Sequence, residues 1–196
     1  MSALYLVLEN GMVFEGLGFG ADKDVTGEIV FTTGMNGYLE TLTDLSYYGQ
    51  IVLHTFPLIG NYGVISEDFE SRSVGPMAYI VKTPCQAPSN FRSEGKLDIF
   101  LKERNIPGLY GIDTRALTRV IREQGVMNGR ITKEDPGKVS LDDICSYRIK
   151  DAVRAVSCTE RKFFEAENAK YTVALLDFGL KENIKRELLK RGCNVW

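Results

Sequence analysis

The sequence predicts an α/β protein with a β-rich first part and the beginning of a second, parallel α/β part. Short apolar runs separated by glycine and asparagine turns fill the chain up to residue 82. After residue 170, an apolar run, an amphipathic helix pattern and another apolar run follow one another. The first pattern is typical of strands joined by tight turns, and the second of a βαβ unit.

The composition favours a folded protein that has no polyanionic partner. With 196 residues, 44% of them hydrophobic, the chain can bury a sizeable core. The 24 Lys and Arg against 26 Asp and Glu leave a net charge of −2, so the overall balance does not favour nucleic acid. No signal-peptide pattern and no apolar run of about 20 residues is found, so we expect no membrane contact and a cytoplasmic location.

The cysteines predict neither a disulfide framework nor a metal site. No CxxC pair occurs, and the spacing favours buried, reduced thiols. We therefore expect no metal in this chain. The four cysteines are Cys85, Cys145, Cys158 and Cys193.

The first predicted elements are a hairpin and a glycine-rich bend. Residues 3–8 and 12–15 flank an Asn-Gly pair, which suits a tight primed turn. The GxGxG string of residues 16–20 is not followed by a helix pattern. We interpret it as a bend or bulge, not as a nucleotide loop, and expect a further turn at residues 22–27.

Residues 27–63 contain the most informative stretch. Two apolar strands, residues 29–33 and 51–56, bracket a segment rich in Gly, Asn, Tyr, Thr and Ser. Loops framed by strands are common places for binding residues. The only histidine, His54, lies in the second strand, and we interpret it as a hydrogen-bonded structural residue. Because the chain also lacks a GxCxG elbow, it contains no complete hydrolytic set.

Beyond this stretch the pattern alternates between strands and helices. We expect a strand at residues 77–82, a helix with an apolar stripe at 97–101, an extended run at 108–112 and a helix between the N-cap Asp113 and Gly125. Arg115, Arg119 and Arg122 fall on one side of the second helix. Their spacing is compatible with a solvated face or, alternatively, with a docking surface for an acidic partner.

The residue pattern changes in the C-terminal third of the chain. Residues 141–147 and 150–156 are weak helix candidates, and the charged residues 157–170 are predicted to be a linker. The βαβ pattern occupies residues 171–196. Because a lone βαβ unit buries little, we expect the sequence to be the front part of a longer protein. The expected domains are thus 1–156 and 171–196.

Four stretches, residues 27–63, 89–92, 111–131 and 175–195, resemble in order the small subunit of glutamine-dependent carbamoyl phosphate synthetase. The resemblance implies a layered β/β/α N-terminal domain over residues 1–156. It implies that residues 171–196 begin a class I glutamine amidotransferase domain built on a doubly wound parallel sheet.

The resemblance also implies a function. The family's small subunit hydrolyses L-glutamine to glutamate and ammonia, and the ammonia passes to a large subunit. That subunit forms carbamoyl phosphate from bicarbonate and two ATP, for arginine or pyrimidine synthesis, so ATP and Mg act there and no cofactor is expected here. The Cys-His-Glu triad of the family would lie beyond Trp196, Cys193 would not be the nucleophile, and this stretch alone would be inactive.

One substrate-binding residue is implied for this chain. In the family, a serine in a T-D-P-S-Y loop reaches the bound glutamine, and the matching position is Ser46. A hydroxyl suits this contact because it both donates and accepts hydrogen bonds. Leu45 replaces the family's proline, which is expected to soften the loop. From the residues alone, Ser46 is interpreted as a turn residue. The alternative function for the whole chain is a docking module without catalysis.

Overall fold

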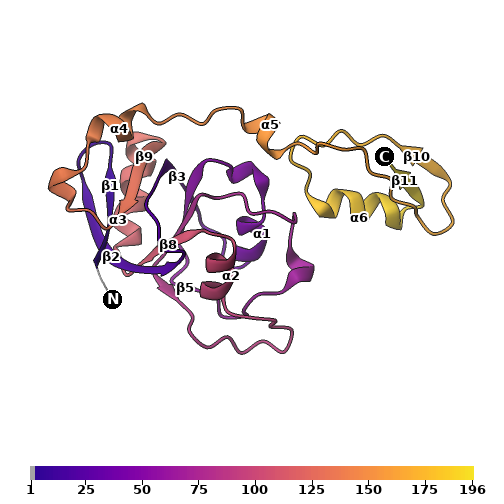
Figure 1. Ribbon diagram of the computed structural model, residues 1–196. Coiled ribbons are helices and arrows are strands. Elements are labelled where there is room, and N and C mark those ends of the chain that lie inside the picture. Colours follow the sequence, from indigo (N-terminus) through magenta and orange to yellow (C-terminus); the bar gives the residue numbers. More distant parts are fainter. Residues whose placement is uncertain (1–2) are drawn as a thin grey trace.

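A computed structural model, which describes residues 3–196, shows a closed β-barrel followed by a small α/β unit (Figure 1). Seven strands close the barrel in the order β1-β2-β8-β6-β4-β3-β9, and β9 pairs back onto β1. The strands are β1 Ala3–Leu8, β2 Val13–Gly20, β3 Val25–Thr32, β4 Gln50–His54, β6 Ala78–Val81, β8 Pro107–Tyr110 and β9 Met127–Thr132.

The barrel combines a parallel half with an antiparallel half. Strands β3, β4, β6 and β8 pair in parallel, whereas β1, β2 and β9 pair antiparallel with their neighbours. The predicted first hairpin is confirmed, with β1 and β2 in antiparallel register. The predicted strands at 29–33, 51–56 and 77–82 are confirmed as β3, β4 and β6, with shifted ends.

Two hydrophobic cores lie on opposite sides of the parallel strands. Along β4, Ile51 and Leu53 point into the barrel, which α3 (Thr114–Gln124) helps to fill, while Val52 points outward. On the outer side, α1 (Tyr38–Leu42) and α2 (Leu97–Glu103) cover the strands. Burial on both faces is what parallel strands normally require.

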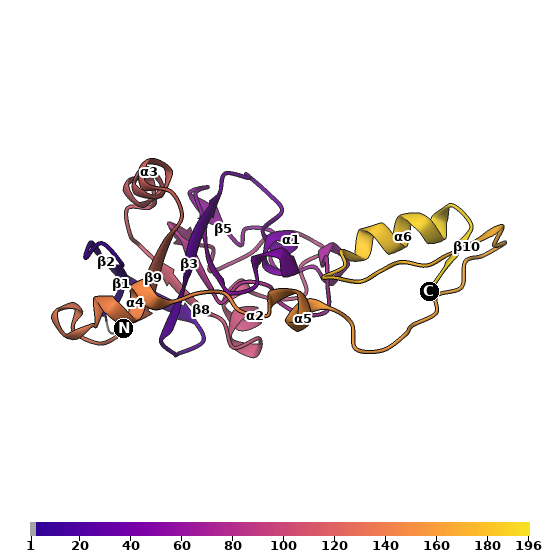
Figure 2. The ribbon, with the colours of Figure 1, turned by 90° about the horizontal axis from the view of Figure 1, so that it is seen from above.

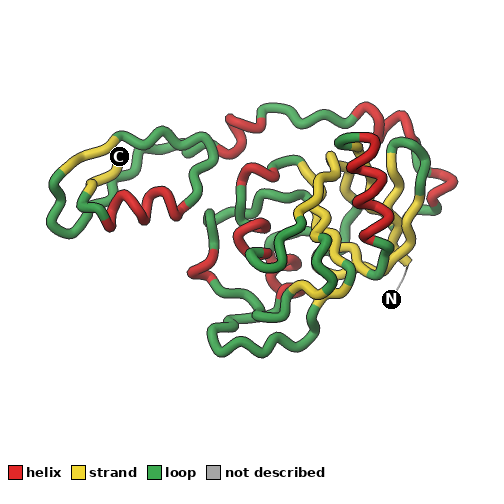
Figure 3. Tube along the Cα trace, turned by 180° about the vertical axis from the view of Figure 1, so that it is seen from behind, coloured by secondary structure: helices red, strands yellow, loops and turns green. Residues whose placement is uncertain are grey.

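The predicted helix ends are confirmed for α3. The Asp113 carboxylate accepts a hydrogen bond of 2.9 Å from the amide of Ala116, as expected for an N-cap. Gly125 follows the helix with a φ of 88°, a conformation that glycine adopts without strain. Seen from behind, α3 lies in front of the barrel strands (Figure 3).

The glycine-rich string was predicted wrongly. Strand β2 runs through residues 16–20 without a break, and β3 already begins at Val25, so the following turn is shorter than expected. A Cβ atom at Gly16 would lie 2.4 Å from the carbonyl oxygen of Tyr110 on β8. The glycine therefore permits close approach of two strands, which is a different reason from a bend.

The second unit contains a parallel strand pair and one helix. Strands β10 (Tyr171–Val173) and β11 (Cys193–Val195) pair in parallel around α6 (Glu182–Lys190), which confirms the predicted βαβ unit. Figure 2 shows this unit extending away from the barrel. Further short elements are β5 Leu58–Ile59, β7 Thr83–Pro84, α4 Leu141–Ser146 and α5 Ala152–Val156.

The mixed α/β class is thereby confirmed. The main sheet closes as a barrel, so the layered β/β/α and doubly wound descriptions remain predictions. Over residues 3–196, no helix has the length and apolar character that a membrane crossing needs.

Candidate functional site

Ser46 lies on an exposed turn between α1 and β4. It is the central residue of a short 3-10 helix, Leu45–Tyr47, whose N-cap is Asp44. The amide of Ser46 donates a 2.9 Å hydrogen bond to Oδ1 of Asp44. The turn therefore presents the hydroxyl at the surface in a fixed local geometry.

Asp44 connects this turn to the second unit. Its side chain is only 13% exposed, and its Oδ2 lies 2.8 Å from Nζ of Lys181, the N-cap residue of α6. Burial alone would raise the pKa of Asp44, but hydrogen bonds from Lys181 and Ser46 outweigh it and hold the pKa below its ordinary value. The same bond raises the pKa of Lys181. Both shifts describe one charged pair between the two units.

A second set of contacts joins α6 to the barrel. The amide of Glu182 donates a 2.7 Å hydrogen bond to the carbonyl oxygen of Glu70. Gly179, in the loop after β10, lies against Leu45, since a Cβ on this glycine would be 3.7 Å from that of Leu45. The beginning of α6 and the Ser46 turn are therefore in direct contact.

His54 is a structural residue, as predicted. It is fully buried, with Nε2 2.7 Å from the carbonyl oxygen of Gly34 and Nδ1 2.7 Å from the hydroxyl of Tyr79. Because the carbonyl only accepts, Nε2 carries the proton and Nδ1 accepts from the tyrosine. Burial lowers the pKa of His54. The ring is thus neutral, fully bonded and unavailable for proton transfer to a substrate.

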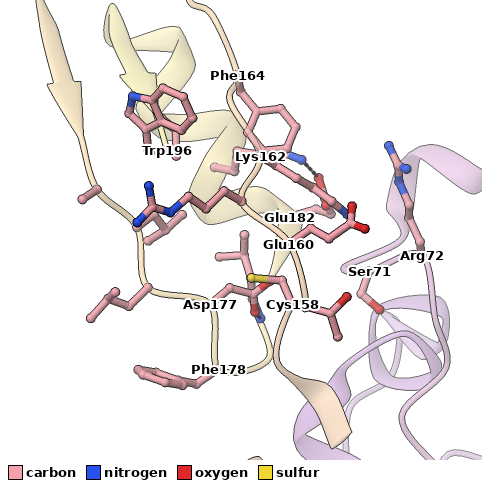
Figure 4. A pocket seen from close by; sticks show the side chains of 18 of the residues that line it. Ser71, Arg72, Cys158, Glu160, Lys162, Phe164, Asp177, Phe178, Glu182 and Trp196 are labelled. Carbon is pink, nitrogen blue, oxygen red and sulfur yellow. Dashed lines mark hydrogen bonds and ion pairs between the residues drawn. The ribbon is translucent and has the colours of Figure 1, made fainter. Parts of the chain in front are cut away.

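A cavity of about 790 Å³ lies between the second unit and the loop at residues 71–73 (Figure 4). It opens at the carboxyl ends of β10 and β11, the edge where open α/β sheets usually bind ligands. Ser46 is not among the residues that line it. The labelled side chains around it are those of Ser71, Arg72, Cys158, Glu160, Lys162, Phe164, Asp177, Phe178, Glu182 and Trp196.

Asp177 at this edge has a local structural task. Its Oδ1 accepts hydrogen bonds from the amides of Gly179, at 2.9 Å, and Leu180, at 2.8 Å. The carboxylate thereby shapes the loop that leads from β10 to Lys181. Among the described residues, no group of three or more His, Cys, Asp or Glu side chains is arranged to hold a metal ion.

The cysteines are free but less buried than predicted. Cys85 and Cys193 are half-buried, whereas Cys145 and Cys158 are exposed. The prediction of buried thiols is therefore wrong, because the polar segments that carry Cys145 and Cys158 lie outside both cores. Cys193 begins β11, the position predicted for it.

The three arginines of α3 are exposed, as their spacing indicated. Arg115, Arg119 and Arg122 form no ion pair with any residue that the structure describes. They lie on the side of α3 opposite to the buried Leu117 and Ile121. This face is free both for solvent and for an acidic partner.

The sequence did not reveal the pair of Asp44 and Lys181. Their positions are 137 apart, so no local pattern connects them. One signal was present, because an aspartate two residues before Ser46 can cap a turn that carries the serine. The partner of its second oxygen follows only from the folded arrangement.

Comparison with known proteins identifies similar chains. A family model described as the carbamoyl-phosphate synthase small chain, CPSase domain, matches residues 6–131. The carbamoyl phosphate synthase small chain of Clostridium perfringens (strain 13 / Type A) is 49% identical over 97% of this chain and 54% of its own length. That of Streptococcus mutans serotype c is 44% identical over 100% of this chain and 54% of its own.

The chain therefore spans about half the length of the curated relatives it matches. Among solved structures, the aminopeptidase from Aneurinibacillus sp. strain AM-1 superposes with a TM-score of 0.37 at 16% identity. That superposition covers 67% of this chain and 31% of the aminopeptidase.

Proposed function

Because the chain belongs to the carbamoyl-phosphate synthase small-chain family, we propose that it is part of the subunit that hydrolyses L-glutamine and supplies ammonia to a large subunit. The large subunit would form carbamoyl phosphate from bicarbonate, ammonia and two ATP, and would hold ATP and Mg. This proposal includes a cytoplasmic location and use of the product for arginine or pyrimidine synthesis.

The proposed division of the chain follows the same family. Residues 1–156 would be the N-terminal domain, 157–170 a linker and 171–196 the start of the amidotransferase domain. The parallel pair β10–β11 with α6 supports the last assignment, since such a unit can extend into a doubly wound sheet. The Cys-His-Glu triad would then come from sequence beyond Trp196.

The contact between the Ser46 turn and α6 is the observation that best supports this function. Asp44 bonds to Ser46 on one side and to Lys181 on the other, so the serine is held beside the unit that would carry the nucleophile. We propose that the Ser46 hydroxyl binds the substrate glutamine. An uncharged hydroxyl can bond to an ammonium or a carboxylate without the cost of desolvating a charge.

The test is Ser46→Ala in the full-length small chain, assembled with its large subunit. The glutamine KM is expected to rise about tenfold, as loss of roughly 1.4 kcal/mol of binding predicts, while synthesis from added ammonia changes little. Ser146→Ala is the matched control, because Ser146 is exposed on α4 and, among the described residues, its hydroxyl bonds only to the carbonyl of Asp143 in its own helix. An unchanged glutamine KM in Ser46→Ala would contradict the proposed contact.

A second test concerns the chain as given. The 196 residues are expected to show no glutaminase activity, because no nucleophile elbow is present and the only histidine is buried and fully bonded. Measurable release of ammonia from glutamine by this chain would contradict the assignment of the triad to later sequence.

A docking module without catalysis is the second candidate function. The exposed arginines of α3 favour it: they form no ion pair within residues 3–196, and a row of guanidinium groups fits an acidic protein surface. The two candidates are compatible, because a subunit that supplies ammonia must also bind its large subunit.

A further inference from the structure

The turn at residues 67–71 lies between the barrel and α6 and is contacted by both. From the side of α6, the guanidinium of Arg186 donates two hydrogen bonds, from Nη1 to the carbonyl oxygen of Glu67 and from Nη2 to that of Phe69, both at 3.3 Å. The amide of Glu182 bonds to the next carbonyl, that of Glu70. Three carbonyl groups of one short turn are therefore bound by one helix.

The barrel side of this turn is firmly anchored. The ring of Phe69 packs on Phe100 of α2, with ring centroids 5.4 Å apart. Arg92 pairs with the carboxylates of Glu67 and Asp68 at 3.2 and 3.0 Å. Because the turn is fixed to the first part, the contacts from α6 fix the second unit relative to the barrel.

The same turn is also bonded to the segment that presents Ser46. The amide of Glu70 donates a 2.9 Å hydrogen bond to the hydroxyl of Thr43, which in turn donates to the carbonyl of Leu39 at 2.7 Å. Thr43 is fully buried and immediately precedes Asp44. A continuous path of hydrogen bonds therefore runs from Arg186 through the turn to the residues that set the position of Ser46.

Arginine is well suited to this contact. Its planar guanidinium has several donors in a fixed arrangement and can bond to two carbonyl oxygens at once, whereas lysine concentrates its charge on a single nitrogen. Arg186 is half-buried, and its neighbour Lys185 turns instead toward Glu182 and the ring of Phe164. The guanidinium of Arg186 thus serves the contact between the two units.

We propose that Arg186 is a positioning residue for glutamine binding. By holding α6 on the turn at residues 67–71, it sets the distance between the Ser46 hydroxyl and the unit that would carry the rest of the glutamine site. This inference rests on the proposed function, in which Ser46 contacts glutamine. Arg186 itself touches neither substrate nor reacting atoms.

The experiment compares variants of the full-length small chain in complex with the large subunit. Arg186→Gln is expected to raise the glutamine KM about five- to tenfold, because it removes two charge-assisted hydrogen bonds that are long by the usual criteria. Synthesis from added ammonia should keep its kcat. Arg186→Lys should restore part of the glutamine affinity. Thermal midpoints close to the parent value will show that the variants are folded.

Arg191→Gln is the matched control. Arg191 directly follows the same helix, but within residues 3–196 its guanidinium bonds only to the carbonyl and carboxylate of Glu187, one turn away. Its removal therefore leaves the contact between the units intact, and the glutamine KM should not change.

A double variant separates this inference from the proposed function. If Arg186 acts through Ser46, then Arg186→Gln combined with Ser46→Ala should have the same glutamine KM as Ser46→Ala alone. Multiplicative effects of the two substitutions, an unchanged KM in Arg186→Gln, or equal losses in the glutamine and ammonia reactions would overturn the role of Arg186. A silent Ser46→Ala would instead overturn the proposed glutamine contact.

Discussion

The barrel and the unit formed by β10, α6 and β11 both pair parallel strands, yet they differ in burial. Ile29 and Ile51 in the barrel are fully buried, whereas Leu176 and Phe178 after β10 are 76% and 66% exposed. Two short strands and one helix do not remove enough apolar surface from water to be stable alone. The barrel therefore stabilises itself, whereas the second unit depends on contacts outside its own strands.

The largest effect is expected when one large apolar side chain is truncated in each part, because the two parts differ in burial. Ile29→Ala should lower the free energy of unfolding by about 2–5 kcal/mol, because it opens a cavity in the barrel core. Leu176→Ala should change it by less than about 0.5 kcal/mol. Urea denaturation of the 196-residue chain measures both, and equal losses would contradict the difference in burial between the two parts.

The close packing of the barrel can be tested at Gly16. Gly16→Ala should cost about 1–3 kcal/mol, since the new Cβ would meet the Tyr110 carbonyl on the neighbouring strand. Gly95→Ala is the control, because among residues 3–196, apart from Gly95 and its two chain neighbours, no heavy atom lies within 4 Å of the position of its Cβ. The two melting temperatures give the answer, and a Gly16→Ala variant as stable as Gly95→Ala would contradict the observed strand spacing.

The single histidine should make the stability of the barrel depend on pH. Because burial lowers the pKa of His54 in the folded state, the unfolded chain binds the extra proton first as pH falls. Barrel stability should therefore decrease below about pH 6.5, with a slope of at most about 1.4 kcal/mol per pH unit. His54→Gln should remove this slope, whatever its effect at neutral pH. Persistence of the slope in the variant would exclude His54 as its cause.

The contact between the parts should respond to stronger acid. The folded pKa of Asp44 is below its ordinary value, so the stabilisation is present above about pH 4 and is lost as pH falls through the folded pKa. Protection of the α6 amides from hydrogen exchange should then fall before that of β4. Lys181→Met should lower the protection of the α6 amides already at neutral pH, by roughly 0.5–1 kcal/mol in the free energy of opening. Protection of α6 that is unaffected by either change would show that the pair does not hold the units together.

The smallest effect on folding is expected at the arginine face of α3. Replacing Arg115, Arg119 and Arg122 together by Glu should change the free energy of unfolding by less than about 0.5 kcal/mol per position. Binding of the full-length chain to the proposed large subunit should nevertheless weaken about tenfold if the face docks an acidic surface. Charge reversal of the exposed Lys138, Lys150 and Arg154 is the control. Equal effects of both triples would favour a solvated face.

Elements with a clear local period were predictable from the sequence. The stripe of Leu117, Val120 and Ile121 with its Asp113 cap identified α3, and the Asn-Gly pair identified the first hairpin. Strand β9 was missed, because Met127–Thr132 contains Asn, Gly and Arg and does not alternate. Its burial comes from the neighbours β1 and β3, which no local pattern specifies.

The candidate site was predictable only in part. Ser46 was proposed through the family resemblance, and the structural role of His54 was predicted from its place in an apolar strand. Asp44, Lys181 and Arg186 gain their partners across the contact between the two units. Long-range pairs of this kind depend on the folded arrangement, and a single sequence contains no record of them.

Closure of the barrel by β1 and β9 has a consequence for synthesis on the ribosome. One edge of β1 can pair with β2 as soon as the hairpin emerges, but its other edge must wait for Met127–Thr132. At roughly 5–20 residues per second, translation of the intervening chain takes on the order of ten seconds. During that time the apolar β1 has an unpaired edge, which is a template for wrong association. The nascent chain is therefore most in need of chaperone protection before β9 appears.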